Sequence, residues 1–322
     1  MSEMKGNLFN RSGLQKFIVF GVMVLLFAVF TVLRPAYSSY QNIMTIILST
    51  CVNGSLAIGV TFIIITAGID LSVGPVMTFT AIMSGTALTI WGWPIWICII
   101  FGILIGILCG AANGVMVAKM GLPPFIATLA MMMMIKGLNL VVSDIRPIYF
   151  TSVEGYQKIA LGSAFGIEGF YNAIIIFVAV AVLGHLLLQK TLLGRYTFAI
   201  GSNKEAARLS GIKVDRWLIV VYATCGFFAA MAGLIMSSRL NSAQPQLGPG
   251  YELEAIAAAV IGGTSLSGGE GSIIGTVIGA FIMSELQNGL RAMSVAPEWQ
   301  FVAIGFVLAL AVYVDMLRKK RN

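Results

Sequence analysis

Charged side chains and histidine are scarce in this sequence. Of its 322 residues only 10% are charged, and there is a single histidine, His185. Water-soluble proteins usually carry about 25% charged residues, because polar groups must cover their surface. A lone imidazole without a neighbouring cysteine or carboxylate is a weak basis for a metal site or for acid–base catalysis. The composition therefore argues against an ordinary soluble enzyme, and we expect no bound metal and no cofactor.

Signatures of redox and nucleotide chemistry are also missing. No CxxC pair is present, and the four cysteines lie in or beside apolar runs, which favours a packing role. There is no Gly-Lys dipeptide, so the GxxxxGK phosphate loop is absent. The stretch 266–270 reads LSGGE and resembles the LSGGQ signature of ABC ATPases, but that signature needs a nucleotide-binding domain around it. We therefore expect a chain that is not an enzyme and does not hydrolyse ATP.

Long apolar runs dominate what is present, since 58% of the residues are hydrophobic. Runs of about 20 residues can cross a bilayer as helices, whereas barrel strands would alternate polar and apolar residues. We expect an all-α integral membrane protein, a polytopic bundle of about ten transmembrane helices, some of them broken. The run 253–262 is too short to span alone, so it either extends back through Tyr251 or forms half of a broken helix. The expected spans are 17–33, 43–67, 72–90, 94–118, 123–142, 170–189, 217–240, 253–262, 273–292 and 300–317.

Basic residues lie between and beside the apolar runs, where they act as topology signals rather than as a nucleic-acid surface. With the N-terminus inside, fourteen Lys and Arg residues fall on one side of the membrane and five on the other. An even number of spans then places both termini in the cytoplasm. Membrane lipid is an expected partner and nucleic acid is not. The expected organisation is a cytoplasmic segment 1–16, a single transmembrane domain 17–317 with a cytoplasmic segment 190–216, and a basic cytoplasmic tail 318–322.

Two glycine-rich segments, 68–74 and 263–269, share the frame G-x-x-L-S-x-G, and each lies between two apolar runs. Glycine permits turns that other residues disfavour. The segments are either ordinary loops or broken-helix segments that line a cavity, where irregular backbone is tolerated at membrane depth. The carboxylate of Asp70 is favoured as a structural cap. The candidate residues are Gly68, Asp70, Ser72, Gly74, Gly263, Ser267 and Gly269.

Glycine also recurs at every fourth position in 102–114 and in 271–279. This spacing places the glycines on one helical face, where another helix can approach closely. The face is either a tight packing surface or one that slides between two states.

A few polar residues stand inside the expected spans. A charge near a span centre costs about 2.5–3.5 kcal/mol on insertion scales, so such residues usually face the bundle interior or water. They either line a water-filled pathway or form interhelical hydrogen bonds. Lys136 either reaches the membrane surface or pairs with Glu285. The candidates are Asn113, Lys136, Asn139, Glu285 and Asn288.

The basic segment 190–216 contains a short candidate helix, which Asn203 can cap and Gly211 can end. Its sequence resembles the coupling loop of bacterial ABC importer permeases, which carry Glu-Ala-Ala followed a few residues later by Gly. The resemblance implies contact with a partner ATPase, and the alternative is an amphipathic surface helix. The residues that carry the resemblance are Glu205, Ala206, Ala207, Arg208 and Gly211.

A wider resemblance covers roughly residues 43–315. The segments AGIDLSVG, LPPFIATLAMMM, LGRYTFAIGSNKEAARLSGI and SAQPQLGPGYELEAIAAAVIGGTSLSGGEGS look like the ribose-type branch of monosaccharide permeases of ABC importers. The resemblance implies a permease of the bacterial inner membrane, paired with an identical chain or a close paralogue. It also implies a cytoplasmic ABC ATPase, as two domains or a fused double ATPase, and a periplasmic or lipid-anchored sugar-binding protein. Trp91, Trp93 and Trp96 are not part of this pattern and leave the sugar open.

Two segments on the outer side, 143–169 and 241–252, are the expected contact with a binding protein. Their charged residues would supply electrostatic complementarity. The rival hypothesis is an ion-coupled secondary sugar transporter, which needs ionisable groups near mid-membrane, and Glu285 is the residue that fits. The outer charged residues are Asp144, Arg146, Glu154, Lys158 and Glu252.

Overall fold

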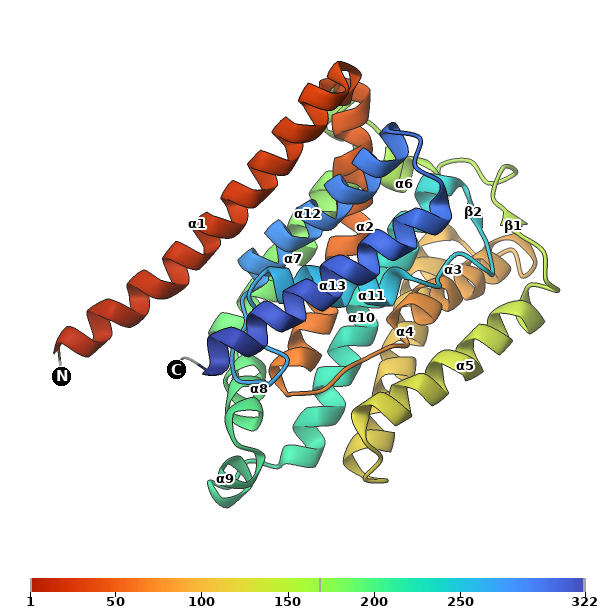
Figure 1. Ribbon diagram of the computed structural model, residues 1–322. Helices are drawn as coiled ribbons and strands as arrows, with labels where there is room; N and C mark the ends of the chain where they lie inside the picture. Colours follow the sequence, from red (N-terminus) through yellow and green to blue (C-terminus); the bar gives the residue numbers. More distant parts are fainter. Residues whose placement is uncertain (1, 168, 321–322) are drawn as a thin grey trace.

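The computed structural model describes residues 2–167 and 169–320, with side chains placed for 17–167 and 169–317 (Figure 1). Met1, Arg321 and Asn322 of the two expected terminal segments lie outside the described residues. In the described part, seven helices are long and apolar enough to cross a membrane. They are α2 Tyr40–Ile65, α4 Ile95–Ala118, α5 Pro124–Val142, α7 Asn172–Lys190, α10 Val214–Leu240, α12 Ile273–Ala292 and α13 Pro297–Lys320.

The three remaining expected spans are helices as well, which confirms the all-α polytopic class. They are the second half of α1 Ser2–Leu33, α3 Val73–Thr89 and α11 Tyr251–Ile261. The short elements are η1 Pro35–Ser38, β1 Ile148–Tyr149, α6 Lys158–Leu161, η2 Ala164–Gly166, α8 Leu192–Ser202, α9 Lys204–Leu209 and β2 Ser242–Ala243.

α2 forms the centre of the bundle, since nearly all of its apolar stretch is buried and it packs against α10, α12, α11 and α7. In the glycine repeat of α4, Gly102 faces Ser84 of α3 and the next three glycines face α10. A Cβ on Gly106 would come within 2.5 Å of the Gly226 carbonyl oxygen, and a Cβ on Gly110 would overlap that of Tyr222. The repeat is therefore a tight packing surface in this structure.

One end of the bundle carries α8 and α9, and we call it the basic end. The connection between α4 and α5 lies there too, because Gly121 and Lys204 border the same cavity. The start of α1 and the end of α13 lie toward this end (Figure 1). The opposite end carries the segment between α5 and α7. Its strand β1 pairs antiparallel with β2, which follows α10, and Ile148 lies opposite Ala243.

Tyr156 anchors that opposite end to α10. Its hydroxyl lies 2.8 Å from the Ser237 hydroxyl, and Ser238 donates to the Tyr156 carbonyl at 2.8 Å. Burial raises the pKa of Tyr156 to about 12, so the phenol stays neutral. The long segment between α5 and α7 is therefore a folded layer over the helix ends.

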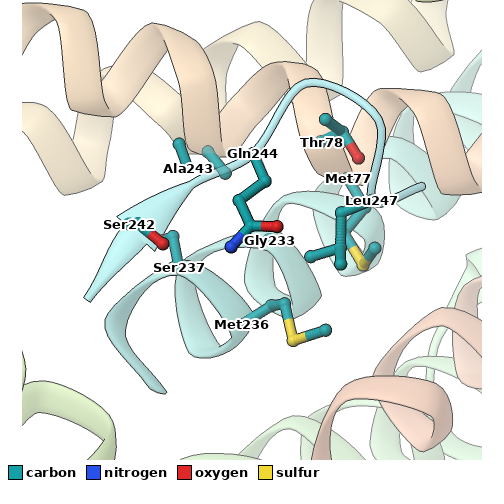
Figure 2. Close-up of a pocket in the computed structure, with 10 residues that line it drawn as sticks. Met77, Thr78, Gly233, Met236, Ser237, Ser242, Ala243, Gln244 and Leu247 are labelled. Carbon is teal, nitrogen blue, oxygen red and sulfur yellow. The ribbon is translucent and has the colours of Figure 1, made fainter. Parts of the chain in front are cut away.

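α11 is half a span. The helix extends back to Tyr251, as one of the two expectations stated. With 11 residues it is about 16 Å long, whereas the hydrocarbon core of a bilayer is about 30 Å thick. The segment 244–250 before it turns into the bundle, where Gly248 packs directly on Gly74. Figure 2 shows this segment passing over α3 and α10. The space beneath it is about 10 Å³, room for at most about one water molecule.

α1 is a long helix that stands partly apart from the bundle (Figure 1). Its 32 residues include the expected segment 1–16 from Ser2 onward, so the helix runs without a break into the first span. It contacts the bundle near its end, where the Phe30 ring fills the space left by Gly289 of α12.

Candidate functional site

α9 is a short capped helix at the basic end. The Asn203 side chain accepts a hydrogen bond from the Ala206 amide at 2.9 Å, which confirms the expected cap. Gly211, two residues beyond the helix, has a φ of +85°, in the left-handed region that glycine adopts easily. Arg208 pairs with Asp215 at the start of α10 at 3.3 Å. The sequence therefore specifies this helix locally.

The two alanines of α9 have different roles. Ala207 is buried, and its side chain packs with Ile200, Val214 and Leu218. Ala206 is exposed, and Leu209 is 90% exposed. Ala207 therefore anchors the helix to α8 and α10, and the surface offered to a partner contains Ala206 and Leu209, together with exposed Glu205 and Arg208.

A cavity of about 240 Å³ opens beside α9. It lies between the end of α2, the connection from α4 to α5, and α8, with Lys204 and Tyr222 among its lining. Most of its wall is apolar, including Leu122, Pro123 and Leu218.

The first glycine-rich segment, 68–74, crosses the interior as irregular backbone between α2 and α3. Asp70 is buried, and its Oδ1 accepts hydrogen bonds from the Ser72 amide at 2.8 Å and the Ser72 hydroxyl at 2.7 Å. Asn113 of α4 donates to the Ser72 hydroxyl at 2.8 Å. The structure thus brings Asp70, Ser72 and Asn113 together, and the carboxylate caps its own turn.

The second glycine-rich segment lies at the basic end, where Gly68 of the first segment also borders the cavity beside α9. Gly269 contacts the last residue of α2 and the end of α8, with Ser267 exposed beside it. Gly263 and Gly269 have φ values of +94° and +79°, which explains glycine at both positions. The end of the second segment therefore meets the beginning of the first, since a Cβ on Gly268 would come within 3.0 Å of the Ala67 side chain.

Two buried glutamates lie at the start of α11: Glu252, expected on the outer surface, and Glu254, which was not among the expected site residues. Glu254 accepts a hydrogen bond from the Asn53 amide of α2 at 2.7 Å. Glu252 accepts one from the Gly250 amide at 3.1 Å, and its other oxygen lies 2.5 Å from the place of a Cβ on Gly74. Glu252 is thus not an outer-surface residue as expected, because α11 begins inside the bundle. Acidic residues in the first turn of a helix, here Tyr-Glu-Leu-Glu, are the signal that could have located them.

The five polar candidates fall into three places. Asn113 joins the Asp70 turn, and Glu285 and Asn288 are buried on α12. Asn139 of α5 donates to the Pro75 carbonyl at 3.2 Å, at the start of α3. One turn earlier on α5, Lys136 is exposed.

Lys136 and Glu285 are not paired. The two ion pairs within the described residues join Arg146 to Asp144 and Arg208 to Asp215.

Comparison with known proteins gives one family. The model described as branched-chain amino acid transport system / permease component matches residues 42–312. The ribose import permease of Bacillus subtilis is 42% identical, covering 95% of this chain and 94% of its own. That of Haemophilus influenzae is 40% identical, covering 92% and 91%. The xylose transport system permease of Escherichia coli is 36% identical, covering 96% and 93%.

Among solved structures, an ABC transporter of metal-chelate type in an inward-facing conformation matches with a TM-score of 0.53. It is 16% identical and covers 94% of this chain and 99% of that one, so the likeness concerns the fold alone. The chain therefore belongs to the family of bacterial ABC importer permeases that includes the ribose and xylose permeases, and it is a multi-pass protein of the bacterial inner membrane.

Proposed function

We propose that this chain is the membrane permease of an importer that moves a monosaccharide, with ribose as the leading candidate. The observation that carries the proposal is 38–42% identity with ribose import permeases over most of the chain, against 36% for the xylose permease. In this proposal a binding protein delivers the sugar from outside. A separate ATPase, with two domains or one fused chain, then biases the permease between two accessible states.

The exposed surface of α9 supports an ATPase partner at the basic end. A short helix with a small residue and a protruding apolar one can seat in a groove of another protein. Ala206 and Leu209 offer that pair, and Arg208 and Glu205 surround it with charge. The proposal places segment 190–216 and both chain termini in the cytoplasm.

Lys136 supports a pathway along α5. Its neighbours Met133, Met134 and Leu138 are also exposed, while the other side of α5 packs on α3 and α4. A lysine exposed to lipid near the middle of a span would cost about 2.5–3.5 kcal/mol, so we infer that this face borders water. A water-filled path there requires a second wall, which an identical chain or a close paralogue would supply.

The segment 143–169 supports a contact for the binding protein at the opposite end. Asp144, Arg146, Glu154 and Lys158 are exposed there and can set register with a partner. The segment 241–252 contributes less than expected, because its second half turns into the bundle. The tryptophans at 91, 93 and 96 lie at this same end, and their exposed rings are typical of an aromatic belt.

Buried carboxylates give the rival, an ion-coupled carrier, more support than the sequence suggested. Asp70, Glu252 and Glu254 join Glu285 inside the bundle. Asp70 and Glu254 nevertheless have hydrogen-bond donors, which favours a structural role. Uptake that needs ATP and persists without an ion gradient distinguishes the two.

The test is uptake of radiolabelled ribose into vesicles that contain the permease, its ATPase and the sugar-binding protein. We expect uptake to require ATP inside and to continue when an ionophore collapses ion gradients. A matched control carries an ATPase whose phosphate-loop lysine is replaced, and it should show no uptake. Uptake that the ionophore stops, or that proceeds without the ATPase, would contradict the proposal. Competition by unlabelled xylose would show how selective the system is.

A further inference from the structure

Three backbone segments meet in close contact beside α9. The Gly269 amide donates a hydrogen bond at 2.9 Å to the carbonyl of Ile65, the last residue of α2. Gly201 of α8 lies against both: a Cβ there would overlap the Ile65 oxygen and come within 2.7 Å of the Gly269 nitrogen. No larger residue fits at position 201 unless α2 or the turn moves. We call Ile65, Gly201 and Gly269 the glycine junction.

The turn that carries Gly269 is continuous with α11 and α12. Gly262, directly after α11, packs on Gly275 of α12 so closely that a Cβ on either residue would overlap the other backbone. One turn further along α12, Gly279 packs in the same way on Ala258 of α11. The turn and its two helices therefore form one compact hairpin. The far end of that hairpin carries the buried glutamates of α11.

A carboxylate from a distant helix holds the turn in place. The Oδ2 of Asp315 on α13 accepts hydrogen bonds from the Ser265 hydroxyl and from the Leu266 amide, each at 3.2 Å. α13 lies across α11 (Figure 1), so this contact fastens the hairpin at its basic end. The two hydrogen bonds tie both a side chain and the backbone of the turn to one oxygen of α13.

Only Asn203 separates the end of α8 from the start of α9. We propose that the glycine junction is the route by which α9 moves the membrane core, and that Asp315 is a positioning residue for this coupling. α8, α9, the end of α2 and the hairpin of α11 and α12 then shift as one body. The inference rests on the proposed function and adds a mechanical path from the basic end to Glu252 and Glu254.

A competing route runs through α10, because the Arg208–Asp215 ion pair and the buried Ala207 also join α9 to that helix. If α10 alone carried the motion, the turn and α8 would slide past each other during the cycle. Asp315 would then be dispensable for coupling. If the glycine junction carries the motion, locking it should leave transport intact and releasing the turn should impair it. If α10 alone carries the motion, locking the junction should block transport and releasing the turn should have no effect.

A disulfide can lock the junction. The Ser202 Oγ lies 2.9 Å from the place of a Cβ on residue 269, which brings the pair Ser202→Cys and Gly269→Cys within disulfide reach, while the φ of +79° strains a cysteine at position 269 and makes the Gly269→Cys single variant an essential control. In vesicles that hold the permease, its ATPase and the binding protein, we expect the disulfide to form with and without ATP. Ribose uptake per ATP hydrolysed should not change on oxidation. Uptake that stops on oxidation and returns on reduction would overturn the proposal. The two single variants are the controls.

Asp315→Ala releases the turn and needs no change at a glycine. We expect ribose uptake per ATP hydrolysed to fall about fivefold or more, which is the lower end of typical coupling between sites. Asp315→Asn keeps an oxygen acceptor, so its ribose uptake per ATP hydrolysed should lie between that of Asp315→Ala and that of the wild type. Glu270→Ala removes an exposed carboxylate from the same turn and should leave the ratio unchanged.

The amount of ATPase that co-purifies and its basal hydrolysis rate should be the same in Asp315→Ala and wild type. An unchanged ratio of ribose to ATP in Asp315→Ala would overturn the role of Asp315. Failure of the wild-type chain to bind an ATPase, or to take up ribose with it, would count instead against the proposed function.

Discussion

Glu254 of α11 accepts a hydrogen bond from the side-chain amide of Asn53 on α2 at 2.7 Å, inside the bundle. The two residues are 201 positions apart in the chain, and both are almost fully buried. The bond ties the start of the half-span α11 to the central helix. It also supplies a donor to a carboxylate that is buried inside the bundle.

We expect Asn53→Ala to destabilise the protein by about 1–3 kcal/mol, because it leaves the Glu254 oxygen buried without that donor. Thermal unfolding of the purified protein in detergent measures the change. Glu254→Gln keeps a partner for the amide and should cost less. Glu270→Gln, at an exposed glutamate, is the matched control and should have no effect. Equal stability of Asn53→Ala and wild type would show that the bond contributes nothing.

The two alanines of α9 should respond differently to a charge. Ala206→Glu adds a carboxylate to an exposed position, so the protein should fold normally while less ATPase co-purifies with it. Ala207→Glu places the same group in the cluster of Ile200, Val214 and Leu218, so it should destabilise the basic end itself. Limited proteolysis between α8 and α10 reports that local loss. If both variants bind the ATPase as wild type does, α9 is not the docking helix.

Lys136 should lie in water within the assembled transporter. We expect Lys136→Cys to react with a membrane-impermeant thiol reagent, because the reagent needs an aqueous path and an ionised thiol. Leu104→Cys, at an exposed position near the middle of α4, is the matched control and should not react because lipid covers it. Equal protection of both cysteines would place Lys136 against lipid or a dry interface.

The orientation of the bundle can be tested in intact cells with two exposed serines. Ser152→Cys lies in the segment proposed to be outside, so an impermeant reagent should label it. Ser202→Cys lies at the basic end, which the Lys and Arg distribution predicts to be cytoplasmic, and should react only after the cells are opened. Labelling of Ser202→Cys from outside would reverse the assignment.

The contact between α4 and α10 should not tolerate side chains at its glycines. Gly110→Ala directs a methyl group into the Tyr222 carbonyl, and overpacking of this kind typically costs about 1–3 kcal/mol. Gly137→Ala is the matched control, since nothing lies within 4 Å of its Cβ position. That change should be neutral or slightly stabilising, because alanine favours helix. The difference in unfolding temperature between the two variants measures the packing effect.

The sequence by itself determined the membrane class, the ten apolar helices and the capped helix at the basic end. Each of these depends on neighbours along the chain: the length of an apolar run, the position of Lys and Arg beside it, and the side chain of Asn203 three residues before the amide that it caps. The glycine repeat likewise predicted a close helix contact, although it did not identify α10 as the partner.

Only the tertiary structure decided which residues meet. It placed Glu252 inside the bundle, separated Lys136 from Glu285, turned Ala207 inward, and brought the end of the second glycine-rich segment against the beginning of the first. The physical reason is that the face a helix presents, and the depth at which it begins, depend on packing against segments far away in the chain. In an apolar sequence nearly every face suits the interior, so hydrophobicity alone cannot choose between them.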